Sequence, residues 1–359
     1  MFRLLTRYRL VAGLVVGALV VLLAVVTILL TRDDPPVEQP PPEPAVEQQP
    51  EETDDPDEAA VPEPARLPLT GMLVDDLPQR PALIVKVSNS PEARPQSGLA
   101  EADLVIEELT EGGITRFMAV FHSQLPEVAG PVRSARPVDV QLFSGFGRPG
   151  FAYSGARDEV RDLLSRAPAV LITEGGPGFF RDRGAHASHP FAPHNLFVEV
   201  EPALAGAAAD GAQPLTDLGW AFNEDPPSVP EGGEGSDGTS IEIAMSAAYR
   251  TSWSYDQPTG LYRRSQNGSA FEVAGGPRVG AANVVVLEVT HYIGASGYPE
   301  TSVLGEGAAV VLRDGQRYPA RWSKPSEIAP LRILDADGRE PFPLKPGPTW
   351  LHLPDHLPD

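Results

Sequence analysis

The strongest constraint on this chain is an uncharged apolar run near its N-terminus. Residues 10–30 read LVAGLVVGALVVLLAVVTILL, which as a helix would be about 31 Å long. The hydrocarbon core of a bilayer is about 30 Å thick. Because the run has no polar stripe that could face water, it predicts a transmembrane helix that crosses the cell membrane once.

The charges on each side of this run predict its orientation. Three arginines precede it and two aspartates follow it closely: Arg3, Arg7, Arg9, Asp33 and Asp34. Basic residues stay on the cytoplasmic side, so we expect residues 1–9 in the cytoplasm and the body of the chain outside the membrane. The alternative is a cleaved signal peptide, whose apolar part is typically about 7–15 residues long and ends at small residues. The run is longer than that, so a signal anchor is favoured.

Residues 31–66 have the composition of a disordered stalk. Between positions 33 and 65 there are ten prolines and twelve acidic residues, without a lysine or arginine. Such a segment cannot bury enough apolar surface to fold and favours extended polyproline conformations. At about 3.1 Å per residue it could hold the body up to roughly 100 Å from the membrane.

Composition also restricts the chemistry of the body. The chain contains no cysteine, which excludes disulfides, thiol nucleophiles, cysteine-based zinc sites and a lipid-modified N-terminal cysteine. Its net charge is −21, which argues against nucleic acid as a partner. We expect no cofactor and no bound metal.

The body is predicted to be an α+β protein of two domains. Residues 67–222 mix strand-like and helix-like patterns, which predicts a mixed α/β N-terminal domain. The expected strands are 82–87, 102–109, 114–121, 150–153 and 169–173, and the expected helices are 137–146 and 157–166. Residues 223–239 are rich in Pro, Gly and acids, and are predicted to be a linker.

Residues 240–359 are predicted to form an all-β C-terminal domain, because their apolar residues recur with period two between turn sequences. The expected strands are 240–246, 249–256, 261–265, 283–290, 308–313, 316–322, 331–334 and 349–353. An aromatic stripe at Tyr249, Trp253 and Tyr255 is more typical of a core than of a sugar-stacking surface.

The hairpin predicted at 102–121 carries charged residues on one face. If Gly112-Gly113 is a two-residue loop, Glu107 and Glu111 each lie diagonal to Arg116, within reach of an ion pair. This arrangement would be either a polar binding site on a rigid sheet or a structural salt-bridge network. Both kinds of cluster shift the pKa values of their charged groups, so the pattern leaves both alternatives open.

The segment GPVRSARP at 130–137 predicts an anion site. Pro137 suits the first position of a helix, so Arg133 and Arg136 would lie just before a helix N-terminus, where positive charge is disfavoured. A bound anion would relieve both arginines. It would be an external carboxylate or phosphate, which we favour, or else Glu107 or Glu111.

Three histidines lie in one loop, at positions 186, 189 and 194. The residues between them are interrupted by proline and no helix would hold the imidazoles together, so zinc binding is not expected. His194 and Asn195 could instead supply a general base or a hydrogen-bond donor.

Taken together, these motifs resemble the YerB-like family of bacterial envelope proteins, over roughly residue 67 to the C-terminus. The resemblance rests on PLTG (68–71), ARPQSG (93–98), EGGITRF (111–117), GPVRSARP (130–137), APHNL (192–196), TGLYR (259–263), SQNG (265–268) and PGPTW (346–350).

The resemblance implies two domains of unknown function, a place in the cell envelope and, for some relatives, association with cell-wall synthesis proteins. Many relatives look like lipoproteins, whereas this chain has no cysteine to carry a lipid. The shared motifs put seven residues in one candidate ligand site: Arg94, Glu111, Arg116, Arg133, Arg136, His194 and Asn195. The hairpin adds Glu107 to this site.

We therefore expect a membrane-anchored envelope protein that binds an anionic cell-wall component, or a cell-wall synthesis protein, through this site. The alternative is a hydrolase or lyase of cell-wall polymers that uses the same site. His194 or Glu111 would then be the catalytic acid or base, and Arg133 and Arg136 would hold the anion. No reaction is established for these residues.

Overall fold

The computed structural model describes residues 64–184, 191–215, 217–227, 236–295 and 297–358. The predicted transmembrane helix at 10–30 and nearly all of the predicted stalk lie outside the described residues. None of the described helices is long and apolar enough to span a bilayer. The predicted stalk ends two residues too late, because strand β1 (Ala65–Arg66) already pairs with β2 (Leu73–Val74).

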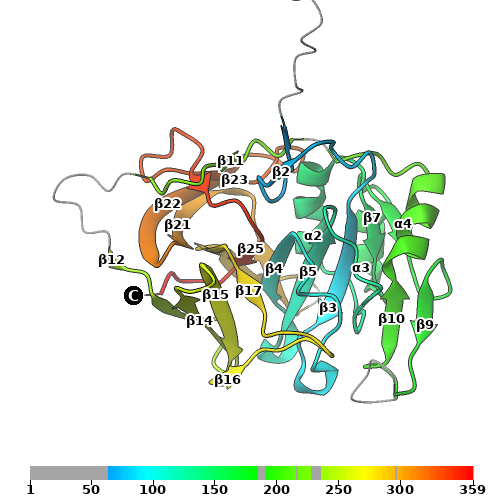
Figure 1. Cartoon of the computed structure of the whole chain (residues 1–359). Coiled ribbons are helices and arrows are strands. Elements are labelled where there is room, and N and C mark those ends of the chain that lie inside the picture. Colours follow the sequence, from blue (N-terminus) through cyan, green and yellow to red (C-terminus); the bar gives the residue numbers. More distant parts are fainter. Residues whose placement is uncertain (1–63, 185–190, 216, 228–235, 296, 359) are drawn as a thin grey trace, which may run out of the picture. The chain divides into compact units, whose positions relative to one another are not determined.

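The body is built around one sheet of eleven strands (Figure 1). In spatial order the strands are β12 (Ser236–Asp237), β22 (Gln316–Lys324), β21 (Gly305–Arg313), β18 (Asn283–Leu287), β25 (Thr349–His352), β4 (Leu104–Leu109), β5 (Thr115–Phe121), β3 (Leu83–Ser88), β7 (Gly150–Ala152) and β8 (Val170–Ile172), with β23 (Arg332–Leu334) paired to β22. β25 lies parallel to both β18 and β4. The two predicted domains therefore share a continuous sheet.

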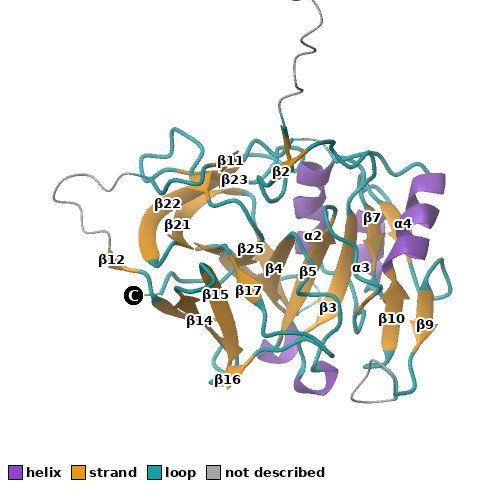
Figure 2. Ribbon diagram, in the orientation of Figure 1, coloured by secondary structure: helices purple, strands orange, loops and turns teal. Residues whose placement is uncertain are grey.

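Three α-helices and three 3-10 helices are described, and all of them precede residue 210. They are α2 (Pro137–Leu142), α3 (Asp158–Leu164), α4 (Val200–Ala209), η1 (Pro91–Ala93), η2 (Glu111–Gly113) and η3 (Phe143–Phe146). Among described residues the C-terminal part contains strands alone, and strands dominate the molecule as a whole (Figure 2). The strand-rich α+β class agrees with the sequence.

Smaller sheets flank the large one. The largest contains β13 (Ser240–Ala244), β14 (Arg250–Asp256), β15 (Leu261–Gln266), β16 (Ser269–Ala270) and β17 (Gly280–Ala281). The others pair β6 (Val128–Ala129) with β10 (Leu196–Glu199) and β9 (Phe179–Arg181), β19 (Thr290–Ile293) with β20 (Pro299–Ser302), and β11 (Ala221–Phe222) with β24 (Pro343–Leu344).

The large sheet is buried on both faces, which explains why β3 reads LIVKVS with every residue buried. One face carries Val85 and Phe117 and packs against α4 and the β13–β15 sheet. The other face carries Ile84 and Met118 and packs against α2 and α3. Trp253 of the aromatic stripe is in the first core, as expected for a structural residue.

The hairpin of β4 and β5 exists as predicted, but its register was predicted wrongly by one residue. Glu111–Gly113 form a 3-10 turn in which Gly112 and Gly113 have φ of 73° and 71°. Glu108 consequently pairs with Arg116, and Glu107 pairs with Phe117. Because side chains alternate between faces, the one-residue shift places Glu107 and Arg116 on opposite faces of the sheet.

Candidate functional site

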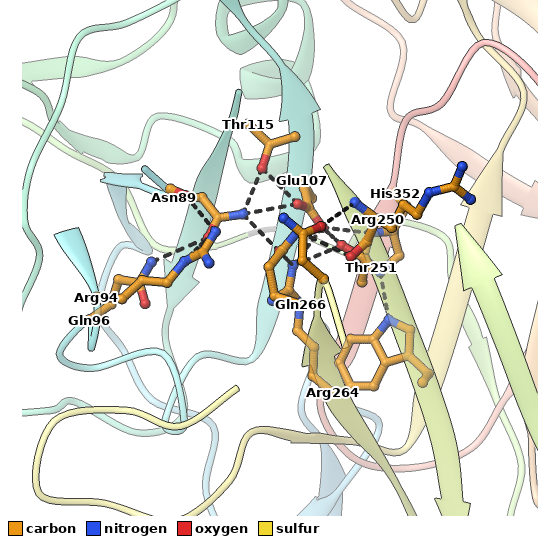
Figure 3. Close-up of polar contacts among 12 residues, drawn as sticks. Asn89, Arg94, Gln96, Glu107, Thr115, Arg250, Thr251, Arg264, Gln266 and His352 are labelled. Carbon is orange, nitrogen blue, oxygen red and sulfur yellow. Dashed lines mark hydrogen bonds and ion pairs between the residues drawn. The ribbon is translucent and has the colours of Figure 1, made fainter. Parts of the chain in front are cut away.

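A buried polar cluster surrounds Glu107, on the face that packs against β14 and β15 (Figure 3). Glu107 Oε1 accepts a hydrogen bond from Thr115 Oγ1 at 2.7 Å, and Oε2 accepts one from Thr251 Oγ1 at 3.0 Å. A nitrogen of the Arg264 guanidinium and His352 Nδ1 each lie 3.0 Å from Oε2. The cluster therefore joins β4 and β5 to β14, β15 and β25.

Arg264 is fully buried and is held by aromatic rings as well as by Glu107. Its guanidinium carbon lies 4.1 Å from the ring centre of Phe271, 5.1 Å from that of Trp350 and 5.2 Å from that of Phe117. Ring faces attract cations, so these contacts compensate part of the lost hydration. Burial alone would raise the pKa of Glu107, but Arg264 and His352 hold that pKa well below its ordinary value.

His352 contributes as a neutral imidazole. Trp253 Nε1 lies 3.0 Å from His352 Nε2, and an indole nitrogen can only donate. His352 Nε2 is therefore the acceptor, and the ring proton sits on Nδ1, facing Glu107. Burial lowers the pKa of His352, which favours the same neutral form.

This cluster is a structural joint between the large sheet and the five-stranded sheet that contains β14 and β15. Glu107, Arg264 and His352 have no solvent exposure, so no external ligand reaches them without unfolding. The predicted ion pair between Glu107 and Arg116 is wrong, because the true register separates the two residues. Arg94 lies at the margin of the joint, where its guanidinium donates to the carbonyl of Asn89 at 2.8 Å.

A second polar cluster lies on the opposite face of the sheet and borders a surface hollow of about 570 Å³. The hollow is lined by Glu111, Arg116, Ser134, Arg136, Gly155, Ala156, Arg157 and Tyr298, and we call it the arginine pocket. It brings together three of the predicted site residues: Glu111, Arg116 and Arg136.

One carboxylate and one carbonyl hold two guanidinium groups in this pocket. Glu111 Oε2 lies 3.1 Å from Arg136 Nε and 3.9 Å from Arg116 Nη2. The Ser134 carbonyl accepts hydrogen bonds from Arg116 Nη1 at 2.8 Å and from Arg136 Nη1 at 3.3 Å. Burial, followed by the positive charge of Arg136, lowers the pKa of Arg116 to about 10, while Glu111 opposes that change.

Arg133 adds a third positive charge to this cluster. Its Nε atom is buried, and none of the described residues accepts a hydrogen bond from it. Burial and the charge of Arg136 lower the pKa of Arg133, while Glu111 opposes that change. The helix end predicted to bind an anion is already capped, because Asp139 Oδ2 accepts from the Arg136 backbone N–H at 2.7 Å. Any anion binding here therefore depends on the guanidinium groups.

A buried trio lies behind the arginine pocket. Lys86 Nζ is 2.6 Å from Asp139 Oδ1 and also forms an ion pair with Glu108. Burial and the adjacent charge of Asp139 raise the pKa of Glu108 to about 7. Glu108 is the register partner of Arg116, so this carboxyl group lies on the same face of the sheet as the pocket.

The other predicted residues, His194 and Asn195, do not line the arginine pocket. The Asn195 side chain bonds within its own hairpin, to Arg181 Nη1 at 2.8 Å and to the Asp182 carbonyl at 3.0 Å. His194 Nδ1 lies 3.4 Å from Ser90 Oγ. His186 and His189 lie outside the described residues, and the described part holds no group of three His, Asp or Glu placed to bind a metal.

Several residues of both clusters were missed from the sequence. Arg157 and Tyr298 line the arginine pocket, and the Arg157 guanidinium lies 4.7 Å from the Tyr298 ring centre. No local signal connects residues so distant along the chain. Arg264 could have been found, since alternation along β15 places it on the same inward face as Tyr262 and Gln266.

Comparison with known families gives two matches that together cover most of the body. The N-terminal domain of DUF3048, described as a protein of unknown function, matches residues 69–213. The C-terminal domain of DUF3048 matches residues 241–351.

A curated relative and a solved structure agree with these matches. The Bacillus subtilis (strain 168) protein named "Putative lipoprotein YerB" is 31% identical over 306 residues, which is 82% of this chain and 88% of the relative. The crystal structure of YerB from Bacillus subtilis matches with a TM-score of 0.69 at 27% identity, covering 82% of this chain and 97% of that one.

Proposed function

Because this chain belongs to the DUF3048 family of YerB-like proteins, we propose that it is a cell-envelope protein that binds an anionic group through its arginine pocket. The ligand would be a carboxylate- or phosphate-bearing component of the cell wall, or an anionic segment of a cell-wall synthesis protein. Residues 10–30 would anchor the chain in the cytoplasmic membrane, with the body outside.

A surplus of positive charge carries this proposal. Arg116 and Arg136 form ion pairs with one carboxylate, that of Glu111, which is itself 27% exposed, while Glu108 and Glu92 act on Arg116 and Arg133 at longer range. Arg133 Nε has no acceptor among described residues, as is also true of two Arg264 nitrogens in the joint, but Arg133 is partly exposed whereas Arg264 is fully buried. An external anion with several oxygens would fill this deficit with charge-assisted hydrogen bonds.

The binding test compares cell-wall fractions. The full-length protein in detergent is incubated with wall polymer that carries phosphate groups and with the same polymer after the phosphates are removed. We expect retention that falls with added salt and that is weakened about tenfold by Arg133→Gln. The matched control is Arg339→Gln on an exposed turn, which removes the same charge elsewhere. Equal retention of both variants would contradict the proposal.

One observation favours a second candidate, a hydrolase of wall polymers. Ser90 Oγ lies 3.4 Å from His194 Nδ1 and 3.2 Å from Ser88 Oγ. Ser88 is the register partner of Arg116, so this serine–histidine pair borders the arginine cluster. In that mechanism His194 Nδ1 would accept the Ser90 hydroxyl proton during attack on an acyl carbon. Release of soluble wall fragments that is abolished in both Ser90→Ala and His194→Ala would establish this candidate over binding alone.

A further inference from the structure

The buried trio of Lys86, Glu108 and Asp139 contains two carboxyl groups and one cation. Lys86 Nζ contacts both carboxyl groups, and the three side chains are at most 1% exposed. Two carboxylates that share one cation away from water repel each other, which favours a proton on one of them. Asp139 also accepts a backbone N–H, whereas Glu108 Oε2 has no hydrogen-bond donor among described residues. The geometry therefore favours the proton on Glu108.

The buried trio meets the arginine pocket at two arginines. Asp139 Oδ2 accepts the backbone N–H of Arg136, at 2.7 Å. Glu108 and Arg116 are register partners on one face of the sheet, where the Cβ atoms of such partners are about 5 Å apart. Burial and Asp139 raise the pKa of Glu108, and Arg136 opposes them. Burial and Arg136 lower the pKa of Arg116, and Glu108 opposes them. The charge of Glu108 and the charges of the pocket therefore act on each other.

The other elements beside β4 carry titratable groups that are engaged elsewhere. On β25 the titratable side chain is His352, which lies on the opposite face of the sheet beside Glu107. β20 also packs against β4, and its hairpin carries His291 and Glu300. His291 Nε2 lies 2.9 Å from a backbone carbonyl, and Glu300 Oε1 lies 3.3 Å from Arg157 Nη2. These polar contacts are made to groups outside the buried trio.

We infer that Glu108 makes anion binding in the arginine pocket depend on pH, because a proton taken up by its carboxyl group strengthens anion binding. The inference rests on the proposed anion site and adds its regulation. A neutral Glu108 no longer offsets the positive charge of Arg116, so more of that charge is available to the ligand. The bound anion in turn favours the protonated carboxyl by the same factor, since coupling between two binding events is reciprocal.

The pH range follows from the position of Glu108. Its pKa is raised to about 7, so its charge changes between about pH 6 and pH 8. The pKa of Glu111 is lowered by Arg136 in spite of burial, so that carboxylate keeps its charge throughout this range. Affinity for an anion should therefore rise as pH falls through about 7.

Calorimetric titration of the full-length protein in detergent with sulfate tests this inference. Sulfate is the probe because, unlike phosphate, it keeps a constant charge near neutral pH. At constant ionic strength we expect sulfate to bind about fivefold more tightly at about pH 5.5 than at about pH 8.5. Near pH 7, titrations in buffers of different ionisation enthalpy should show that wild type takes up part of a proton with each sulfate bound.

Two variants assign the pH dependence to one group. Glu108→Gln carries an uncharged side chain at every pH, so it should bind sulfate at all pH values about as tightly as wild type does at low pH. The control is His291→Gln, which removes a neighbouring group that can also titrate near neutral pH, and it should retain the pH dependence.

The outcomes separate the inference from the proposed function. Sulfate binding without proton uptake in wild type overturns the link to pH and leaves the anion site standing, and this measurement holds even if Glu108→Gln does not fold. A pH dependence that persists in Glu108→Gln, or disappears in His291→Gln, also overturns the link alone. Failure of wild type to bind sulfate at any pH overturns the anion site as well.

Discussion

Removing the Glu107 carboxylate should destabilise the fold strongly without changing any solvent-exposed group. Glu107→Gln keeps the size of the side chain but leaves Arg264 as a fully buried cation without a counter-charge. Breaking one partner of a buried ion pair typically costs about 3–5 kcal/mol, and the aromatic rings around Arg264 offset about 1–2 kcal/mol of this. We therefore expect unfolding free energy to fall by about 3 kcal/mol at pH 7.

A double variant separates charge from packing. Glu107→Gln combined with Arg264→Met removes both charges, and replacing a whole buried pair is often nearly neutral. We expect the double variant to be more stable than Glu107→Gln alone, by about 2 kcal/mol in urea unfolding. A cost below about 1 kcal/mol for Glu107→Gln, or simple additivity of the two single changes, would refute the description of this cluster as an ion-paired joint.

The same joint makes the stability of the fold depend on pH. The pKa of Glu107 is lower in the folded state than in the unfolded chain. The unfolded chain therefore takes up a proton first as pH falls. The contribution is present above the ordinary glutamate pKa of about 4.5 and is lost as pH falls below it. The penalty of Glu107→Gln should accordingly shrink below about pH 4.5.

Three further predictions follow from the neighbouring residues. The pKa of Glu108 is raised to about 7, so the folded state holds a proton that the unfolded chain has already lost, and wild-type stability should fall as pH rises from about 4.5 to about 7. Glu108→Gln should reduce that slope in urea titrations at several pH values. Glu111→Gln removes the internal competitor for Arg136, so phosphate affinity measured by calorimetry should rise several-fold, and a fall would show that Glu111 organises the site. Ser246→Ala loses a 2.6 Å hydrogen bond to the Gly113 carbonyl and should cost about 1 kcal/mol in urea unfolding, with no cost if the Glu111 turn holds its own shape.

Local patterns predicted most central strands and two of the three described α-helices, but not α4 or the strands β9, β10, β19 and β20. The helix expected at 137–146 is present as α2 followed by η3, and the one expected at 157–166 is α3. The turns at Asn267-Gly268 and Asp314-Gly315 have the positive φ values that such sequences favour. These features depend on neighbouring residues only, so one sequence suffices to find them.

Long-range pairing could not be predicted from the sequence. β25 pairs with β4 although about 245 positions separate them, and neither strand carries a signal for its partner. The hairpin register was predicted wrongly for a local reason. Gly112-Gly113 favours a two-residue loop, but the turn also includes Glu111, and that one residue moved Glu107 from the predicted site into the core.

The candidate site was predicted in part. Glu111, Arg116 and Arg136 meet as the motifs suggested, with Arg133 close enough for their charges to shift its pKa. Glu107 and Arg94 belong instead to the joint around Arg264. Tyr298 and Arg157 come to the pocket through packing of the β19–β20 hairpin, which no local pattern reveals.

We propose that the cluster of Arg116, Arg133 and Arg136 is a ligand site rather than a structural network. Titration of full-length wild type, Arg133→Gln and Arg339→Gln with inorganic phosphate, together with urea unfolding of each, tests it most directly. Arg133 Nε has no acceptor among described residues, so Arg133→Gln should bind phosphate about tenfold more weakly while its stability is unchanged or higher. Unchanged phosphate affinity together with a stability loss above about 1 kcal/mol would contradict it.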